Sequence, residues 1–382
     1  MKVLMLSTDK ALFDESAPVR ARLLEYASLV SELYVVVYTP KGEQYKEQSP
    51  GNHLHLYPTR SSGKFSYLPD AYRKAREIIA KHGKREEWLI TTQDPFDTGA
   101  VGYLLSKLNN IPVHMQLHTD PWSDAWKRSG MLNRMRAMLA LYLLPRADGI
   151  RVVSLRLKKR LLAMGIAEAK ITQIPVYVDV NYFHDTEPTF DLHQSYAGSS
   201  DIILSIGRLS REKNYSGLIR AFAKIHKTHE GAVLIIVGSG PERDRLIHLT
   251  RFLGVSDEVK ILPWARETVS YYKTCDIYVQ PSLYEGYGMA LIEAMASGAP
   301  VLMTDVGCAG EVVVSEETGL VVKVGNEEEL LFALERFLFD RALRLKLAAQ
   351  GQQKVLTLPS KADTLVLYRE SWERAYRQVK SS

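Results

Sequence analysis

Apolar residues in the first half of the chain fall into short, nearly continuous runs that alternate with longer stretches of helical spacing. The amphipathic stretches include 17–30, 69–82 and 155–164. The apolar runs, which predict strands, are 2–6, 33–38, 88–91, 112–117, 149–153 and 171–175. Continuous apolar strands separated by helices are typical of a parallel sheet that is covered on both faces.

A polar, weakly periodic stretch at 181–200 interrupts the alternation and predicts a linker. After it the alternation restarts, with predicted strands at 202–206, 232–237, 259–262, 276–280 and 300–303. The chain closes with a helix over 361–379, whose Trp372 and Tyr376 need a surface to cover. The pattern predicts an α/β protein with two doubly wound domains, 1–182 and 183–360. Ligands of such sheets bind beyond the carboxyl ends of the strands, so two facing domains would form a cleft.

The composition is that of an ordinary globular protein. Its 382 residues are 46% hydrophobic and 24% charged, and this length favours two domains. No apolar run reaches the roughly 18 residues of a membrane span, and the opening MKVLMLST is too short and strand-like for a signal peptide. Cys275 and Cys308 lack metal-site spacing, which disfavours structural zinc and disulfides. We therefore expect a cytoplasmic protein.

The net charge of +5 is unevenly distributed along the chain. Residues 1–180 carry 26 Lys and Arg against 18 Asp and Glu, whereas residues 181–382 carry 23 against 26. A basic first half favours an anionic surface or substrate on that side. The chain has no basic stripe interleaved with aromatic residues and no helix-turn-helix pattern, so nucleic acid is not an expected partner.

The segment EGYGMALIEAMASGAPV, residues 285–301, combines two carboxylates with a glycine-rich turn. Helical spacing begins at Met289, so Glu293 lies within a short apolar helix and Glu285 in the turn before it. The N-terminus of a helix offers unpaired N–H groups to an anion. Two carboxylates beside such a seat would repel the anion itself, so we expect them to accept hydrogen bonds from hydroxyl groups attached to it. The segment predicts a ligand with phosphates in the middle and hydroxyls at both ends.

Two cations follow the first strand of the second domain. In GRLSREKN, Arg208 and Lys213 leave the same strand end, and Gly207 permits close approach to the backbone. Such a pair suits a diphosphate, although a solvated basic loop is the plain alternative. The later GSGPERDRL, residues 238–246, resembles half of a dinucleotide fingerprint, and a tight strand-to-helix turn is the favoured interpretation.

The first domain carries polar residues at two strand ends. His118 and Asp120 follow the strand at 112–117, where catalytic groups gather, although a lone histidine is as often structural. Asp94 and Asp97 follow the strand at 88–91, and the sequence gives them no preferred role.

The segment 126–146 has helical spacing and many basic residues. Its pattern fits a helix lying on an anionic membrane. It also fits an ordinary helix with an apolar face on the core and a basic face in solvent, and this second interpretation is favoured.

Taken in order, these motifs resemble the retaining glycosyltransferases of family 4. The resemblance covers most of residues 150–325, and its hallmark is the E-x7-E spacing of Glu285 and Glu293. It runs through VVSLRLKKRL (152–161), IPVYVDVNYF (174–183), SIGRLSREKNYSGLIRAF (205–222), LIIVGSGPERDRL (234–246), DIYVQPSLYEGYGMALIEAMASGAPVLMTDVG (276–307) and EETGLVV (316–322). It implies the GT-B architecture, in which two Rossmann-like domains with parallel sheets face each other across a cleft.

The resemblance also implies roles for single residues. Arg208 and Lys213 match the pair that binds the diphosphate of the sugar donor, and Glu285 and Glu293 match the carboxylates that bind the donor sugar and the ribose. The amides of Tyr287, Gly288 and Met289 match those that meet the phosphates, and Gly207, which precedes Arg208, is also expected in the donor site. His118 matches a histidine that faces the donor sugar. The closing helix, 361–382, matches one that returns to the first domain.

One departure concerns the loop after the first strand. The family usually has glycine there, but residues 8–23 contain none, and we expect Arg20 to reach the cleft instead. Arg20 and Asp120 are therefore the candidates for the acceptor side.

The resemblance implies a metal-independent, retaining hexosyltransferase without a cofactor. Its donor would be a nucleotide-diphosphate sugar, and its acceptor a hydroxyl of a glycan or a lipid-linked molecule in cell-envelope or polysaccharide synthesis. The basic segment 126–146 leaves an anionic membrane surface open as a further partner, which would place the protein at the inner face of the membrane. The alternatives are a sugar-nucleotide 2-epimerase of the same layout, an NAD-dependent oxidoreductase and a non-catalytic nucleotide-sugar-binding protein.

Overall fold

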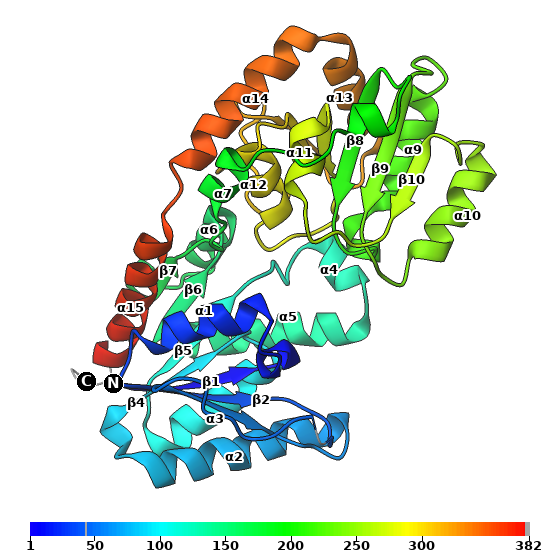
Figure 1. Ribbon diagram of the computed structural model, residues 1–382. Helices are drawn as coiled ribbons and strands as arrows, with labels where there is room; N and C mark the ends of the chain where they lie inside the picture. Colours follow the sequence, from blue (N-terminus) through cyan, green and yellow to red (C-terminus); the bar gives the residue numbers. More distant parts are fainter. Residues whose placement is uncertain (43, 379–382) are drawn as a thin grey trace. The chain divides into compact units, whose positions relative to one another are not determined.

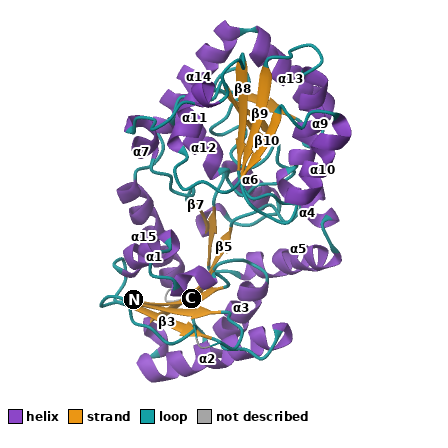
Figure 2. Ribbon diagram, turned by 45° about the vertical axis from the view of Figure 1, so that its right-hand side comes forward, coloured by secondary structure: helices purple, strands orange, loops and turns teal. Residues whose placement is uncertain are grey.

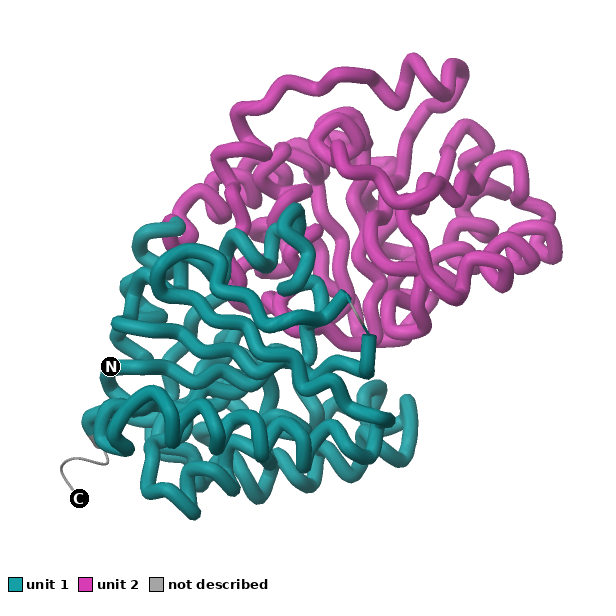
Figure 3. The backbone as a smooth tube through the Cα atoms, turned by 60° about the horizontal axis from the view of Figure 1, so that its bottom comes forward, with its two compact units in different colours: residues 1–175, 361–382 teal, residues 176–360 magenta. Residues whose placement is uncertain are grey.

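The computed structural model describes residues 1–42 and 44–378 (Figure 1). The chain divides into two compact units, coloured separately in Figure 3. Unit 1 comprises Met1–Pro175 together with Lys361–Ser382, and unit 2 comprises Val176–Ser360. The predicted boundary after residue 182 cuts through helix α7 (Val180–Asp185), which packs on the helices of unit 2 and belongs to that unit.

Unit 1 is built on one fully parallel sheet of order β3-β2-β1-β4-β5-β6-β7. Every residue of β4 and β5 is buried, which explains why these strands appear as continuous apolar runs in the sequence. The strands are β1 (Lys2–Ser7), β2 (Glu32–Val37), β3 (Leu54–Pro58), β4 (Trp88–Thr92), β5 (Val113–Leu117), β6 (Gly149–Val152) and β7 (Ile171–Gln173).

Helices cover both faces of this sheet. Helices α2 and α3 lie on one face, whereas α1 and the closing helix α15 lie on the other (Figure 1). The helices of unit 1 are α1 (Pro18–Ala27), α2 (Tyr67–His82), α3 (Asp97–Asn109), α4 (Asp124–Arg128), α5 (Met131–Leu143), α6 (Leu155–Ala163) and α15 (Lys361–Gln378). Trp372 of α15 is fully buried in one core cluster with Val3, Leu33 and Leu89. The helix expected over 361–379 thus completes the core of unit 1 rather than that of unit 2.

Unit 2 repeats the architecture with a parallel sheet of order β10-β9-β8-β11-β12-β13. Its strands are β8 (Asp201–Ile206), β9 (Ala232–Val237), β10 (Val259–Leu262), β11 (Ile277–Gln280), β12 (Val301–Thr304) and β13 (Leu320–Val322). The strand order reverses between β8 and β11, so their carboxyl ends form the switch point at which such sheets bind ligands.

The helices of unit 2 flank its sheet on two sides (Figure 2). Helices α9, α10 and α13 pack together on one side, and α7, α11, α12 and α14 on the other. Their bounds are α7 (Val180–Asp185), α8 (Leu192–Ser195), α9 (Tyr215–Ile225), α10 (Arg243–Leu253), α11 (Val269–Thr274), α12 (Met289–Ala296), α13 (Glu327–Phe339) and α14 (Arg341–Leu356). In the described part of the chain, no helix is both long and apolar enough to cross a membrane.

The stretch 181–200 is an ordered part of unit 2, so the linker prediction is wrong. It contains most of α7 and all of α8, whose N-caps are the side chains of Asp179 and Asp191. The N–H of Thr189 donates to Ser270 Oγ at 2.8 Å, which fastens the stretch to α11. Polar side chains therefore anchor this segment to the unit where apolar periodicity is weak.

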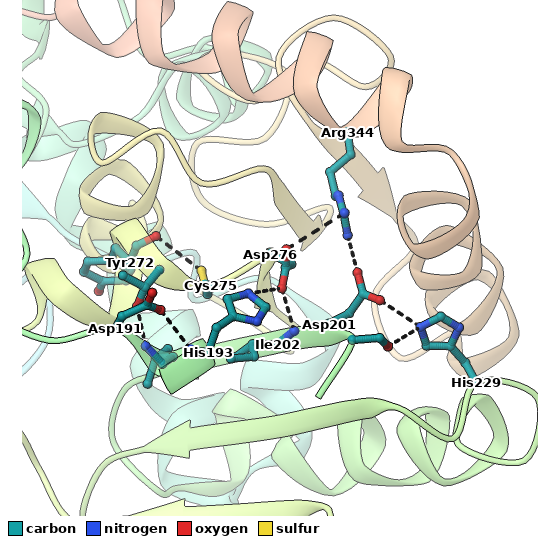
Figure 4. Close-up of polar contacts among 12 residues, drawn as sticks. Asp191, His193, Asp201, Ile202, His229, Tyr272, Cys275, Asp276 and Arg344 are labelled. Atoms are coloured by element: carbon teal, nitrogen blue, oxygen red, sulfur yellow. Dashed lines mark hydrogen bonds and ion pairs between the residues drawn. The ribbon is translucent and has the colours of Figure 1, made fainter. Parts of the chain in front are cut away.

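A partly buried cluster of charges ties helices α8 and α14 to the amino ends of β8 and β11 (Figure 4). Arg344 Nη1 lies 2.7 Å from Asp201 Oδ1, and Arg344 Nη2 lies 3.9 Å from Asp276 Oδ1. His229 and His193 contact the same two carboxylates, each at 2.9 Å. The cluster lies at the opposite end of the strands from the switch point, so we assign it to stability.

Candidate functional site

The candidate site of unit 2 begins where two loops meet at the carboxyl ends of β8 and β11. The loop after β8 carries Gly207 through Asn214, and the loop after β11 leads to α12. The N–H of Leu283 donates to the carbonyl oxygen of Glu212 at 2.7 Å, so a backbone hydrogen bond joins the loops directly. The backbones of the two loops at the switch point are therefore held in a fixed arrangement.

The GSG turn after β9 supports the loop after β8. A Cβ atom on Gly238 would lie 1.9 Å from the carbonyl oxygen of Gly207, and one on Gly240 would lie 2.4 Å from that of Leu209. Leu209 also exchanges backbone hydrogen bonds with this turn and with Glu242. The two glycines are thus required by close backbone packing, which agrees with the favoured interpretation of a tight turn.

The two cations of the loop after β8 have different surroundings. Arg208 is exposed, and its guanidinium has no hydrogen bond or ion pair within residues 1–42 and 44–378. Lys213 Nζ forms an ion pair with Glu285 Oε1, which also accepts a hydrogen bond from Ser282 Oγ at 2.7 Å. The structure therefore brings together Lys213 and Glu285, which lie far apart in sequence, and adds Ser282 to the candidate set.

Helix α12 presents an open N-terminus beside this ion pair. Its N-cap is Gly288, at φ +105°, a left-handed conformation that favours glycine. No side chain caps the helix, and the N–H groups of Met289 and Ala290 have no acceptor in the described part of the chain. Tyr287 is buried, and its carbonyl oxygen accepts from the N–H of Cys308 at 3.0 Å. These free amides, together with Arg208, can seat an anion.

Glu293 lies one turn into α12 and faces different partners from Glu285. Its Oε2 accepts a hydrogen bond from the Tyr272 hydroxyl at 2.9 Å. Burial raises the pKa of Glu293, and the hydrogen bond from Tyr272 opposes this effect. The two carboxylates are therefore separate groups: one pairs with a lysine of the loop after β8, and the other rests on a tyrosine of α11. The sequence held no signal for Tyr272 beyond an aromatic residue in a short helix.

His118 follows β5 at the carboxyl edge of the sheet of unit 1. Burial, together with the positive charges of Arg151 and Arg22, lowers the pKa of His118 to about 3. The imidazole is thus neutral at pH 7, so it can donate or accept a hydrogen bond but carries no charge.

The two acceptor-side candidates of unit 1 are engaged in local structure. Arg20 is only 8% exposed, and its guanidinium donates to Gln48 Oε1 at 2.9 Å. The same guanidinium donates to the carbonyl oxygen of Phe13, so Arg20 connects the glycine-free first loop with Gln48 within unit 1. Asp120 Oδ1 lies 3.0 Å from Arg160 Nη1 and accepts from the N–H of Trp122 at the same distance. One oxygen of Asp120 is thus committed to its own loop.

Asp94 and Asp97 also have structural partners. Asp94 Oδ1 accepts from the N–H of Phe96 at 2.7 Å and caps the turn before α3. Asp97, in the first turn of α3, pairs with Arg136 of α5. These contacts explain both carboxylates without a ligand.

Helix α5 turns its large apolar side chains outward. Met131 is 78% exposed and Met138 is 63% exposed, whereas the buried side of the helix consists of Ala137, Ala140 and Leu143. The helix thus faces the core with a small apolar side, as the favoured interpretation predicted, but its solvent side carries large apolar residues as well as basic ones. Its large apolar residues in solvent are Met131, Leu132, Met135, Met138, Leu141 and Tyr142.

Two family models match consecutive parts of the chain. One, described as Glycosyltransferase Family 4, matches residues 27–182, and the other, described as Glycosyl transferases group 1, matches residues 193–354. An uncharacterized glycosyltransferase of Methanocaldococcus jannaschii is 35% identical over 77% of this chain and 77% of its own length. The chain belongs to glycosyltransferase family 4. It is a glycosyltransferase, as the order of its motifs predicted.

Two further proteins extend the comparison. The lipopolysaccharide core biosynthesis glycosyltransferase LpsE of Rhizobium meliloti is 32% identical over 155 residues, which are 41% of this chain and 44% of LpsE. The crystal structure of Anabaena HepE in complex with UDP-glucose superposes with a TM-score of 0.72 and 20% identity, covering the whole of both chains. This likeness confirms the GT-B fold class.

Proposed function

We propose that this glycosyltransferase moves a hexose from a nucleotide-diphosphate sugar to an acceptor hydroxyl with retention of configuration. The proposal rests on one observation: the Lys213–Glu285 ion pair lies beside the free N-terminus of α12, with Glu293 one turn further along. In this arrangement Arg208, Lys213 and the amides of α12 bind the diphosphate. Glu285 accepts hydrogen bonds from hydroxyls of the sugar, and Glu293 accepts hydrogen bonds from those of the ribose. The UDP-glucose bound by HepE is a ligand of this class.

The proposed reaction needs charge stabilisation more than a covalent nucleophile. The bond between the anomeric carbon and the phosphate oxygen breaks, the acceptor oxygen bonds to the same face of that carbon, and its proton passes to the departing phosphate. Arg208 and Lys213 offset the charge that develops on the leaving diphosphate, so the proposal includes no metal and no cofactor. A neutral His118 would contribute a hydrogen bond on the sugar side rather than a proton.

The first test uses Lys213→Ala. Calorimetry with UDP, GDP and ADP would identify the nucleotide that binds, and the variant should bind it about tenfold more weakly or worse, because a charge-assisted contact contributes about 1.5–3 kcal/mol. Arg211→Ala is the matched control, since Arg211 lies in the same loop, is exposed and contacts Glu242 at 3.4 Å. Equal affinities for Lys213→Ala and the parent protein would show that the diphosphate does not bind at this loop.

The reaction itself is tested by product analysis. With an acceptor present, a transferase releases the free nucleoside diphosphate in proportion to the new glycoside. A 2-epimerase would instead interconvert two sugar nucleotides and release none. The anomeric configuration of the glycoside, read by proton NMR, tests retention.

We further propose that the acceptor is lipid-linked or lies at a membrane, with the protein at its cytoplasmic face. The support is the outward apolar side of α5, which is flanked by the exposed cations Arg128, Arg134 and Arg146. Arg136 pairs with Asp97 and is left out of this surface. A helix with exposed apolar residues and basic neighbours suits the interface of an anionic bilayer. The lipopolysaccharide role named for LpsE is consistent with such an acceptor.

Binding to vesicles tests the membrane proposal. The protein should sediment with phosphatidylglycerol vesicles at low salt and be released as salt rises, because each cation near the surface contributes about 1 kcal/mol that ions screen. A Met131→Ser, Met135→Ser, Met138→Ser variant should lose most of this binding. Leu345→Ser is the control, since Leu345 is similarly exposed but lies in unit 2. Absence of sedimentation at low salt would favour a water-soluble glycan acceptor.

A further inference from the structure

Tyr272 of α11 is a buried residue that contacts the candidate site through Glu293. It is 1% exposed, and its ring packs edge-on against Tyr278 of β11 and Phe183 of α7, with centroid distances of 5.4 and 6.0 Å. Its backbone carbonyl accepts from Cys275 Sγ at 3.3 Å (Figure 4). Two neighbouring elements therefore hold the ring, which fixes the direction of its hydroxyl.

That hydroxyl occupies one oxygen of Glu293. Tyr272 donates to Glu293 Oε2 at 2.9 Å, whereas Oε1 has no hydrogen-bond partner in the part of the chain that the structure describes. A carboxylate held at one oxygen loses the freedom of its last torsion, so its second oxygen points in a defined direction. Such preorganisation favours a ligand hydroxyl that comes from that direction.

We propose that Tyr272 is a positioning residue that aims Glu293 Oε1 at a ribose hydroxyl and thereby makes the site prefer ribonucleotides to deoxyribonucleotides. The inference deepens the proposed function and rests on it. It does not require Tyr272 to touch the nucleotide. A site built to pair with a hydroxyl discriminates strongly against ligands that lack it, because its own polar group is then left unpaired.

Tyr272 also helps to keep Glu293 ionised. Burial raises the pKa of Glu293, and the Tyr272 hydrogen bond is the contact that lowers it. Burial, and in addition the negative charge of Glu293, raises the pKa of Tyr272 and of Tyr278 well above the usual tyrosine value, so neither tyrosine is charged at pH 7. Without the hydrogen bond, Glu293 would become protonated at a higher pH and would accept ribose hydroxyls less well there.

The experiment compares Tyr272→Phe with the parent protein. Calorimetry is carried out with the nucleoside diphosphate that binds most tightly among UDP, GDP and ADP, and with its 2′-deoxy and 3′-deoxy forms. The variant should bind the ribonucleotide about tenfold more weakly and lose most of the preference for ribose. Glu293→Gln should lose the same preference, and the double variant should add little, because both changes remove one interaction. The fall of affinity at acidic pH should also begin at a higher pH in Tyr272→Phe.

Tyr271→Phe is the matched control. Tyr271 neighbours Tyr272 in α11, is partly exposed, and packs edge-on against Phe190 at 4.9 Å, away from Glu293. It should keep both the ribose preference and the pH profile. The inference is overturned if Tyr272→Phe retains the ribose preference that Glu293→Gln loses, or if it weakens ribose and deoxyribose forms equally. A parent protein that binds none of the three diphosphates would overturn the proposed function instead.

Discussion

Glu285→Gln should lower turnover by about 100-fold while leaving nucleoside-diphosphate affinity within about threefold of the parent value. In the proposed function Glu285 accepts hydrogen bonds from hydroxyls of the transferred sugar, and an amide oxygen accepts a weaker hydrogen bond than a carboxylate does. A loss of this size corresponds to about 2.7 kcal/mol, which lies within the range for a charge-assisted hydrogen bond. The substitution also frees Lys213 from its ion pair, so the diphosphate should keep its cation. Initial rates and calorimetry measure the two effects separately.

Glu293→Gln is the natural comparison, since the same change is made eight residues later, inside helix α12 rather than in the loop before it. It should weaken nucleoside-diphosphate affinity, because the product contains the same ribose as the donor and would lose the hydrogen bonds from its hydroxyls to Glu293. The opposite pattern, with affinity lost at Glu285 and turnover alone at Glu293, would mean that the sugar and the ribose are assigned the wrong way round. If both variants merely lose melting temperature and stay active, the carboxylates only match the charge of the helix N-terminus, worth about 0.3–1 kcal/mol each.

The sequence predicted the fold well where burial is two-sided. Strands such as β4 and β9 appear as unbroken apolar runs because helices cover both faces of their sheets. Strand β3 was missed because it lies at the sheet edge, where its residues alternate between buried and half-buried. Strand β13 was missed because only three residues, Leu320–Val322, form it. The segment 181–200 was misassigned because isolated apolar residues such as Phe183 and Phe190, together with polar side chains, hold it in place without a regular apolar period.

The candidate site shows a similar division between local and long-range information. The glycine N-cap of α12 and the strand-end position of Arg208 follow from local spacing. Pairing of Lys213 with Glu285 does not, because the two residues approach only when β8 and β11 become neighbours in the sheet. Helix α5 gives the reverse lesson. Its amphipathic pattern was recognised, but the pattern could not show that Ala137 and Ala140 supply the buried side, where small side chains allow close helix packing.

Arg344→Met should lower the free energy of unfolding by about 3–5 kcal/mol, the usual cost of removing one partner from a buried ion pair. The side chains of Arg344 and Asp201 are 12% and 11% exposed, so Asp201 has little access to water that could compensate for the lost arginine. The variant would leave Asp201 with His229, and Asp276 with His193 and the N–H of Ile202. Urea denaturation at pH 7, followed by the fluorescence of the tryptophans, measures the loss.

The pH dependence of this loss separates the charge of Arg344 from its packing. Burial opposes ionisation of Asp201, but hydrogen bonds from Arg344 and His229 outweigh it and lower its pKa below 3.8. A carboxyl group with a depressed pKa stabilises the folded state above its unfolded pKa and loses this contribution as pH falls through the folded value. The difference between parent and variant should therefore be largest near neutrality and shrink below about pH 4. Arg336→Met removes a more exposed partner of Glu316 and should cost less than about 1 kcal/mol. A difference between parent and Arg344→Met that stays constant from pH 7 to pH 3.5 would assign the effect to lost packing of the arginine stem.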